Sequence, residues 1–83
     1  MRGKYCYEQV LDAASEIVRR KGRNEFTTHE VIDFLRDRGT KFKDTTISTH
    51  VVSRCCVNAP DNHATTYKYF ERIASGTYRV IGI

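Results

Sequence analysis

The chain has 83 residues, of which 40% are hydrophobic and 29% are charged. This length suits one compact domain with one core, and this balance differs from the charge-rich, aromatic-poor composition of disordered chains. Fourteen Lys and Arg residues against ten Asp and Glu residues give a formal net charge of +4, which suits a polyanionic partner.

The first predicted element is an amphipathic helix from Tyr5 to Lys21. Cations at residues 19–21 close it where the helix dipole favours positive charge, and Gly22 supplies a left-handed stop. Its apolar residues recur at steps of three and four and form one stripe: Tyr7, Val10, Leu11, Ala14, Ile17 and Val18.

A second helix is predicted from about Thr28 to Arg38. Residues 24–26 are too few for a helix and predict a short extended connection before it. Thr27 and Glu30 form a capping box at its start, and Gly39 ends it. Its inward-facing residues are expected to be Val31, Ile32, Phe34 and Leu35.

A third helix is predicted from a cap at Asp44 or Thr45 to about Val57. Its buried stripe is marked by Ile47, Val51 and Cys55. A spacing of 100° per residue places short polar side chains on the other side, with His50 and Val52 at the flanks: Thr45, Thr46, Thr49, Ser53 and Cys56. Exposed helix faces ordinarily carry Glu and Lys, so this face indicates a contact surface, and a solvated Thr-rich face is the alternative.

The C-terminal part of the chain is predicted to be a β-hairpin. Turn-forming residues at 58–62, with Pro60 among them, end the third helix and begin a loop. Residues 66–73 and 77–81 are β-prone, and Ala74-Ser75-Gly76 between them reads as the turn.

This order predicts an α+β fold with three helices, a short strand between the first two and a C-terminal hairpin, and it resembles the winged helix-turn-helix family across roughly the whole chain. The segments that carry the resemblance are TTHEVIDFLRDRG, TTISTHVVSRCCV and YFERIASGTYRVI. It implies that the third helix enters the major groove of double-stranded DNA while the hairpin contacts the backbone or minor groove. The turn is shorter than a common wing and the loop before the hairpin is longer, so this loop is a candidate replacement for the wing.

Two segments, THEVIDFLR and VVSRCCVNAP, also resemble winged-helix modules that are fused to restriction endonucleases, some of which sense modified bases. This narrower resemblance implies that residues 58–67, with Pro60, His63 and Tyr67, help to test the DNA. A reader of modified DNA and a transcriptional regulator are therefore both open interpretations.

The chemistry of the third helix favours phosphate contacts and packing on thymine methyl groups. Hydroxyl groups stand where Arg, Asn or Gln would make bidentate base contacts, and loop residues such as Asn58 are equally plausible as ordinary turn formers. The expected DNA contacts are Lys41, Lys43, Thr45, Thr46, Thr49, His50, Ser53, Arg54, Asn58, His63 and Lys68.

Other classes of function find little support in the sequence. The three cysteines fit neither a disulfide framework nor zinc spacing, and His29 has no ligand partner at such spacing. Paired carboxylates and phosphate loops are missing, so we expect no enzyme, no metal and no cofactor. Short apolar stretches and the absence of a signal-peptide pattern predict a cytoplasmic protein without a membrane span. Besides double-stranded DNA, the expected partners are a fused or associated nuclease or a second copy, and the alternative function is a protein-interaction or dimerisation module.

Overall fold

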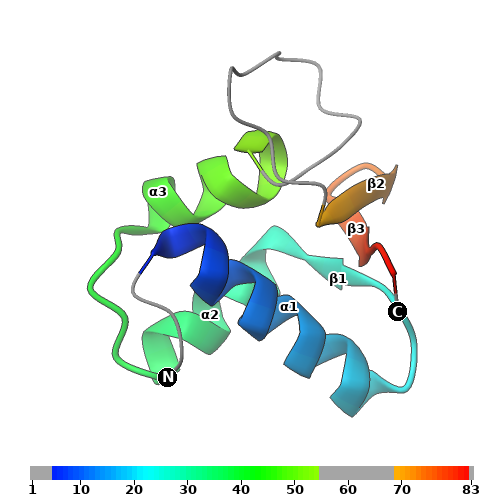
Figure 1. Cartoon of the computed structure of the whole chain (residues 1–83), viewed down its shortest axis with the longest axis horizontal. Coiled ribbons are helices and arrows are strands. Elements are labelled where there is room, and N and C mark those ends of the chain that lie inside the picture. Colours follow the sequence, from blue (N-terminus) through cyan, green and yellow to red (C-terminus); the bar gives the residue numbers. More distant parts are fainter. Residues whose placement is uncertain (1–4, 55–68, 83) are drawn as a thin grey trace.

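The computed structural model describes residues 5–54 and 69–82. In chain order its elements are α1 (Cys6–Lys21), β1 (Phe26–Thr27), α2 (Thr28–Asp37), α3 (Asp44–Thr49), the π-helix η1 (His50–Arg54), β2 (Phe70–Ala74) and β3 (Thr77–Val80). Figure 1 shows α1 crossing α2, with α3 above them and the β2–β3 pair at the other end of the molecule. The predicted α+β class is confirmed, and the arrangement is winged-helix-like.

Helix α1 begins one residue later than predicted, with Tyr5 as its N-cap, and ends at Lys21 as predicted; its apolar stripe forms one wall of the core. Gly22 adopts a φ of 75°, and its amide donates to the Val18 carbonyl at 3.0 Å, which closes the helix in the left-handed conformation. The sequence did not predict that Gln9 would be buried as well. The Thr40 hydroxyl donates to Gln9 Oε1 at 2.8 Å and so ties α1 to the turn after α2.

The capping box at the start of α2 is confirmed. The Glu30 amide donates to Thr27 Oγ1 at 3.2 Å, and Glu30 Oε1 accepts from the Thr27 amide at 2.8 Å. Lys21 Nζ at the end of α1 donates to the same Glu30 oxygen at 2.7 Å. Glu30 therefore joins two helix ends as well as capping one of them.

We expect Glu30 to make stability depend on pH in the acid range. Partial burial raises the pKa of Glu30, but hydrogen bonds from Lys21 and Thr27 outweigh it, so the pKa lies below the ordinary value of 4.5. A carboxyl with a lowered folded-state pKa contributes stability above its unfolded-state pKa and loses it as the pH falls through the folded-state value.

Glu30→Gln keeps an oxygen acceptor for the Thr27 amide but loses the charge that pairs with Lys21. It should therefore destabilise the protein by about 0.5–1 kcal/mol at pH 7, in the range of a partly exposed ion pair, and by progressively less below pH 4.5. Urea denaturation of both proteins at pH 7 and pH 3 measures this difference. Asp37→Asn is the control, because Asp37 is exposed on the same helix and forms no ion pair within residues 5–54 and 69–82. A difference between wild type and Glu30→Gln that stays constant with pH would contradict the assignment.

The predicted third helix differs in its start and in its last turn. Lys43 is the N-cap and makes no side-chain capping bond, so the expectation of a cap at Asp44 or Thr45 was wrong. Asp44 instead lies in the first turn, where the helix dipole favours a negative charge, and its Oδ2 is 3.4 Å from the Arg36 guanidinium. From His50 the chain continues as the π-helix η1, and residues 55–57 lie outside the described ranges.

The three strands form one antiparallel sheet in the order β1-β3-β2. Phe26 pairs with Tyr78, and Phe70 pairs with Val80. The predicted turn is one residue shorter than expected, because Ala74 pairs with Thr77 as the last residue of β2 and leaves Ser75-Gly76 to close the hairpin.

A side-chain clamp fixes the sheet to the end of α1. The Asn24 side chain donates to the Val80 carbonyl and accepts from the Val80 amide, each at 2.8 Å. This pairing imitates a strand partner at the end of β3. The turn between α1 and β1 is therefore held in a fixed position against the hairpin.

The core lies between the three helices and one face of the sheet. Phe26 and Phe70, both fully buried, meet edge to face with ring centroids 4.9 Å apart, and Tyr78 lies 5.9 Å from Phe26. Leu35 from α2 and Ile47 from α3 belong to the same buried cluster. Among the described helices, none has the length and apolar character needed to cross a bilayer.

Candidate nucleic-acid interface

One side of α3 is anchored in the core, and the opposite side faces outward. Ile47 in α3 and Val51 in η1, which continues the helix, are fully buried, as their spacing predicts. Thr45 and Thr49 are exposed, while Thr46 and His50 are half-buried at the edge. We call Thr45, Thr46, Thr49 and His50 the α3 outer face.

Two internal hydrogen bonds fix the polar groups of this face. Thr49 Oγ1 donates to the Thr45 carbonyl at 2.9 Å, one helical turn earlier. His50 Nδ1 lies 2.9 Å from the Thr46 carbonyl. A carbonyl only accepts, so Nδ1 is the protonated nitrogen and donates in this contact. The outer face is therefore ordered before any partner arrives.

The connector between α2 and α3 presents two lysines beside this face. Lys41 and Lys43 are exposed and flank Phe42, which is half-buried and packs on the core. The Phe42 amide donates to Thr40 Oγ1 at 3.3 Å, and the Lys43 carbonyl accepts from the Ile47 amide at 3.0 Å. The backbone on both sides of Phe42 is thereby fixed next to the first turn of α3.

These two lysines differ from most other cations in the described ranges. Arg19, Arg20, Lys21, Arg23, Arg36 and Arg79 each form an ion pair with a carboxylate. Within residues 5–54 and 69–82, neither Lys41 nor Lys43 has such a partner. Their charges are thus available to an outside anion.

Charge is also distributed unevenly along the sequence. Residues 36–54 contain five basic and two acidic side chains, whereas residues 5–35 contain four basic and six acidic ones. The positive excess therefore accompanies the end of α2, the connector and α3. Such an asymmetry favours encounters with a polyanion in which α3 faces the polyanion.

The last turn of the predicted reading helix is the π-helix η1. Single π-turns are rare and occur frequently at functional sites. The backbone of Ser53 and Arg54 belongs to η1, but their side chains lie outside the described part of the structure. The remaining predicted contacts, Asn58, His63 and Lys68, lie in the range 55–68, which the structure does not describe.

The tip of the hairpin adds an exposed apolar residue that the sequence reasoning missed. Ile73 is 47% exposed next to the Ser75-Gly76 turn, although the alternation of β2 gave no reason to single it out. Arg79 is paired with Glu71 on the neighbouring strand, so its charge is already compensated. Phosphate contacts from this part of the hairpin therefore depend on other groups.

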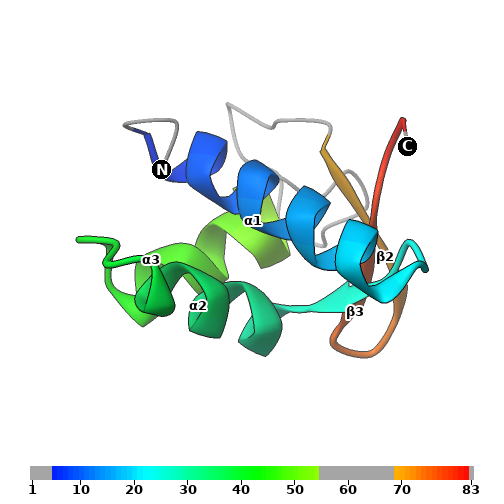
Figure 2. The same cartoon turned by 90° about the horizontal axis from the view of Figure 1, so that it is seen from below.

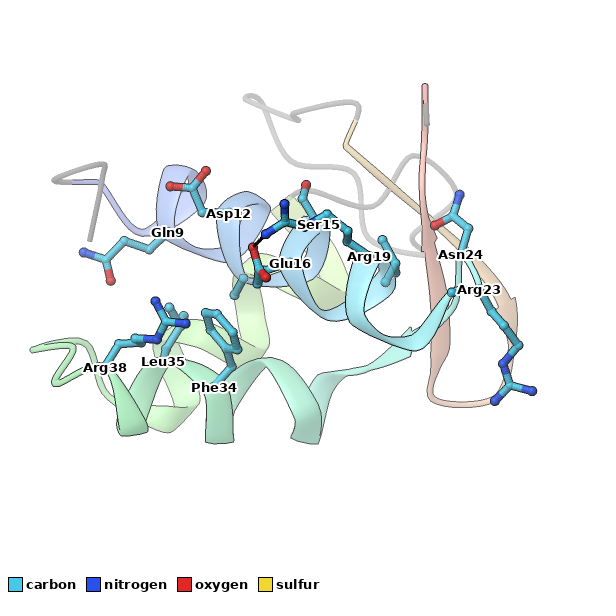
Figure 3. A pocket seen from close by; sticks show the side chains of 13 residues that line it. Gln9, Asp12, Ser15, Glu16, Arg19, Arg23, Asn24, Phe34, Leu35 and Arg38 are labelled. Atoms are coloured by element: carbon cyan, nitrogen blue, oxygen red, sulfur yellow. Dashed lines mark hydrogen bonds and ion pairs between the residues drawn. The ribbon is translucent and has the colours of Figure 1, made fainter.

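A groove of about 760 Å³ lies between α1 and α2, and no pattern in the sequence indicates it. Figure 3 shows Phe34 rising from α2 toward Glu16 of α1, with Arg38, the residue after α2, beside Phe34. The Arg38 guanidinium lies 4.4 Å from the centre of the Phe34 ring. Figure 2 shows the two helices one above the other, and the described residues that line the groove come from them and from the turn after α1, with none from α3 or the hairpin.

Glu16 is the acidic centre of this groove. Its two oxygens accept from Arg19 and from Arg20. The hydrogen bond from Arg19 is the largest influence on Glu16 and lowers its pKa, partial desolvation opposes it, and Arg20 adds to the lowering. Glu16 therefore stays ionised and neutralises part of the cationic end of α1.

The described cysteine is buried and unreactive in character. Cys6 is 5% exposed, and burial raises the pKa of its thiol to about 11. It is therefore protonated at neutral pH, and the thiolate is the nucleophilic form.

His29 Nε2 lies 3.1 Å from Asp33 Oδ2 on the exposed side of α2. In the described ranges, no three His, Cys, Asp or Glu side chains gather closely enough to hold a metal ion.

Comparison with known proteins gives one assignment. Searches of curated proteins and of solved structures returned no match to the chain. A family model described as "Domain of unknown function (DUF7669)" matches residues 8–80, which include every element from α1 to β3 apart from the first two residues of α1. The chain belongs to this family, DUF7669.

Proposed function

We propose that the protein binds double-stranded DNA, with α3 in the major groove and Lys41 and Lys43 on the phosphate backbone. The observation that carries this proposal is the placement of two lysines, which have no acidic partner among the described residues, beside an exposed, hydroxyl-bearing helix face. The buried side of α3 holds that face outward through Ile47 and Val51.

The dimensions of DNA support this arrangement. The major groove of B-DNA admits one α-helix, and the residues before a reading helix lie close to the sugar-phosphate backbone. The connector at residues 39–43 directly precedes α3. Lysines in that position can meet phosphates while Thr45 and Thr49 face the base edges.

The composition of the outer face predicts moderate rather than high sequence selectivity. Phosphate contacts position a protein on DNA, whereas base-edge contacts specify the sequence. The described outer face has no Arg, Lys, Asn or Gln, and these are the residues that make the strong bidentate base contacts. Most of the affinity should therefore come from charge.

The proposal fits either of two biological roles. A transcriptional regulator and the reader module of a nuclease would use the same interface, in the cytoplasm that the cysteine pattern favours. They differ in the partner attached to the domain. The binding surface itself is common to both, so a direct binding experiment tests the shared claim.

Fluorescence anisotropy with a labelled duplex of about 20 base pairs, at salt concentrations from 50 to 200 mM, provides that test. Each phosphate neutralised contributes about −0.9 to the slope of log K against log[salt], so contacts from Lys41 and Lys43 alone predict a slope of about −2. The same strand without its complement serves as competitor and should displace the duplex poorly. Absence of duplex binding at 50 mM salt would overturn the proposal.

A further inference from the structure

We infer that the α3 outer face recognises a pyrimidine C5-methyl group that lies beside an exocyclic amino group in the major groove. This inference rests on the proposed function and adds the base chemistry that the interface selects. It follows from the two internal hydrogen bonds of the outer face, which determine what Thr49 and His50 can still offer to DNA.

Thr49 offers mainly its methyl group. Its hydroxyl hydrogen is donated to the Thr45 carbonyl at 2.9 Å, so the hydroxyl lies against the helix backbone and has no proton left to give. The side chain is nevertheless exposed. The γ-methyl is therefore the group available for contact, and methyl contacts with threonine are a known way of reading the C5-methyl of thymine.

His50 offers an acceptor. Its Nδ1 donates to the Thr46 carbonyl at 2.9 Å, which fixes the tautomer of the neutral ring and leaves Nε2 with a lone pair. An acceptor at the major-groove edge pairs with the amino group of adenine N6 or cytosine N4. It repels guanine, whose O6 and N7 are both acceptors.

Together these two residues select a base edge that bears a methyl group and an amino donor. An A·T pair presents both, the amino group on adenine and the methyl group on thymine. An unmodified C·G pair presents the amino group without the methyl group. Cytosine acquires the methyl group when it is methylated at C5. The methyl group and the amino group can therefore come from an A·T pair or from C5-methylcytosine paired with guanine, and the test separates these two sources.

Four duplexes that differ only at two central base pairs provide the test. They carry A·T, A·U, C·G or C5-methylcytosine·G at these positions. Replacing thymine by uracil removes the methyl group and leaves every base-pair hydrogen bond. Burial of one methyl group predicts about fourfold tighter binding for each methyl contacted, so A·T should bind more tightly than A·U, and C5-methylcytosine·G more tightly than C·G.

Two variants of Thr49 test whether its methyl group causes the preference for A·T over A·U. Thr49→Val keeps a γ-methyl and loses the hydroxyl, so the preference for A·T over A·U should persist. Thr49→Ser keeps the hydroxyl that bonds the Thr45 carbonyl and loses the methyl, so this preference should disappear. Thermal melting of both variants shows that the fold is retained. A preference that follows the hydroxyl instead of the methyl would overturn the assignment of Thr49.

His50 is tested with a purine·T duplex in which the adenine analogue lacks the N6 amino group. The wild-type protein should prefer A·T to purine·T, and His50→Ala should bind the two equally. A wild-type protein that does not distinguish them would overturn the role of Nε2.

The result also separates this inference from the proposal on which it rests. Equal binding of all four duplexes with a normal salt slope overturns the base recognition and leaves DNA binding intact. Absence of duplex binding at low salt overturns both. A preference confined to A·T, or to methylated cytosine, supports the inference and identifies the source of the methyl group.

Discussion

Phe26→Ala is expected to lower the free energy of unfolding by about 3–5 kcal/mol, the usual cost of deleting a buried phenylalanine side chain. Phe26 is fully buried, meets Phe70 edge to face at 4.9 Å and belongs to β1, which pairs with β3. The substitution removes an aromatic contact between β1 and β2 within the core cluster that the sheet shares with the helices. The total free energy of unfolding of a small domain is only about 5–15 kcal/mol, so much of the stability should disappear.

Urea denaturation followed by circular dichroism measures this loss. Phe26→Leu keeps most of the volume and should cost less than about 1.5 kcal/mol, as volume-conserving core substitutions do. Ile73→Ala removes an exposed apolar side chain and serves as the surface control. A Phe26→Ala protein with the midpoint of the wild type would show that Phe26 is not central to the core.

The double variant Lys41→Gln/Lys43→Gln is expected to weaken duplex binding about a hundredfold, because a hydrogen bond to a charged group contributes about 1.5 kcal/mol, or about tenfold, for each lysine. The slope of log K against log[salt] should become shallower by about 2, since two phosphate contacts are lost. Both side chains are exposed and without ion pairs in the described ranges, so the fold should remain intact.

The matched control is Arg19→Gln/Arg23→Gln, which removes the same charge from exposed positions around the end of α1. Net charge changes equally in both double variants, whereas the location and the ion pairing of the removed cations differ. Salt titrations of duplex binding with the three proteins make the comparison. Equal losses in the two double variants would show that binding depends on net charge and not on the connector.

Periodicity and turn chemistry predicted much of the fold. The stripe of α1, the left-handed Gly22 and the Thr27–Glu30 box each arise from neighbours within four residues, and local rules describe such contacts well. Ile47 and Val51 followed from the same rules, and their burial determines which side of α3 faces outward.

Long-range pairing and backbone adjustments were not predictable in this way. The Asn24 clamp on Val80 joins residues 56 positions apart, and the buried Gln9 depends on Thr40 from another element. The apolar residues around the π-helix η1 (His50–Arg54) keep the spacing of an ordinary α-helix, so the hydrophobic periodicity of the sequence does not reveal it. That Lys41 and Lys43 have no carboxylate partner in the described part of the chain likewise became visible only in the folded arrangement of its acidic side chains.

The measurement that tests the central claim most directly is a titration of isotope-labelled protein with duplex DNA, followed by two-dimensional NMR of each backbone amide. DNA binding through α3 predicts the largest shifts at Lys41, Lys43, Thr45, Thr46 and Thr49, with little change at Ala13 and Leu35 beside the α1–α2 groove. Saturable shifts confined to that groove would contradict the account by placing the DNA there. An α3 that does not respond at any DNA concentration would contradict it and favour a protein-docking role instead.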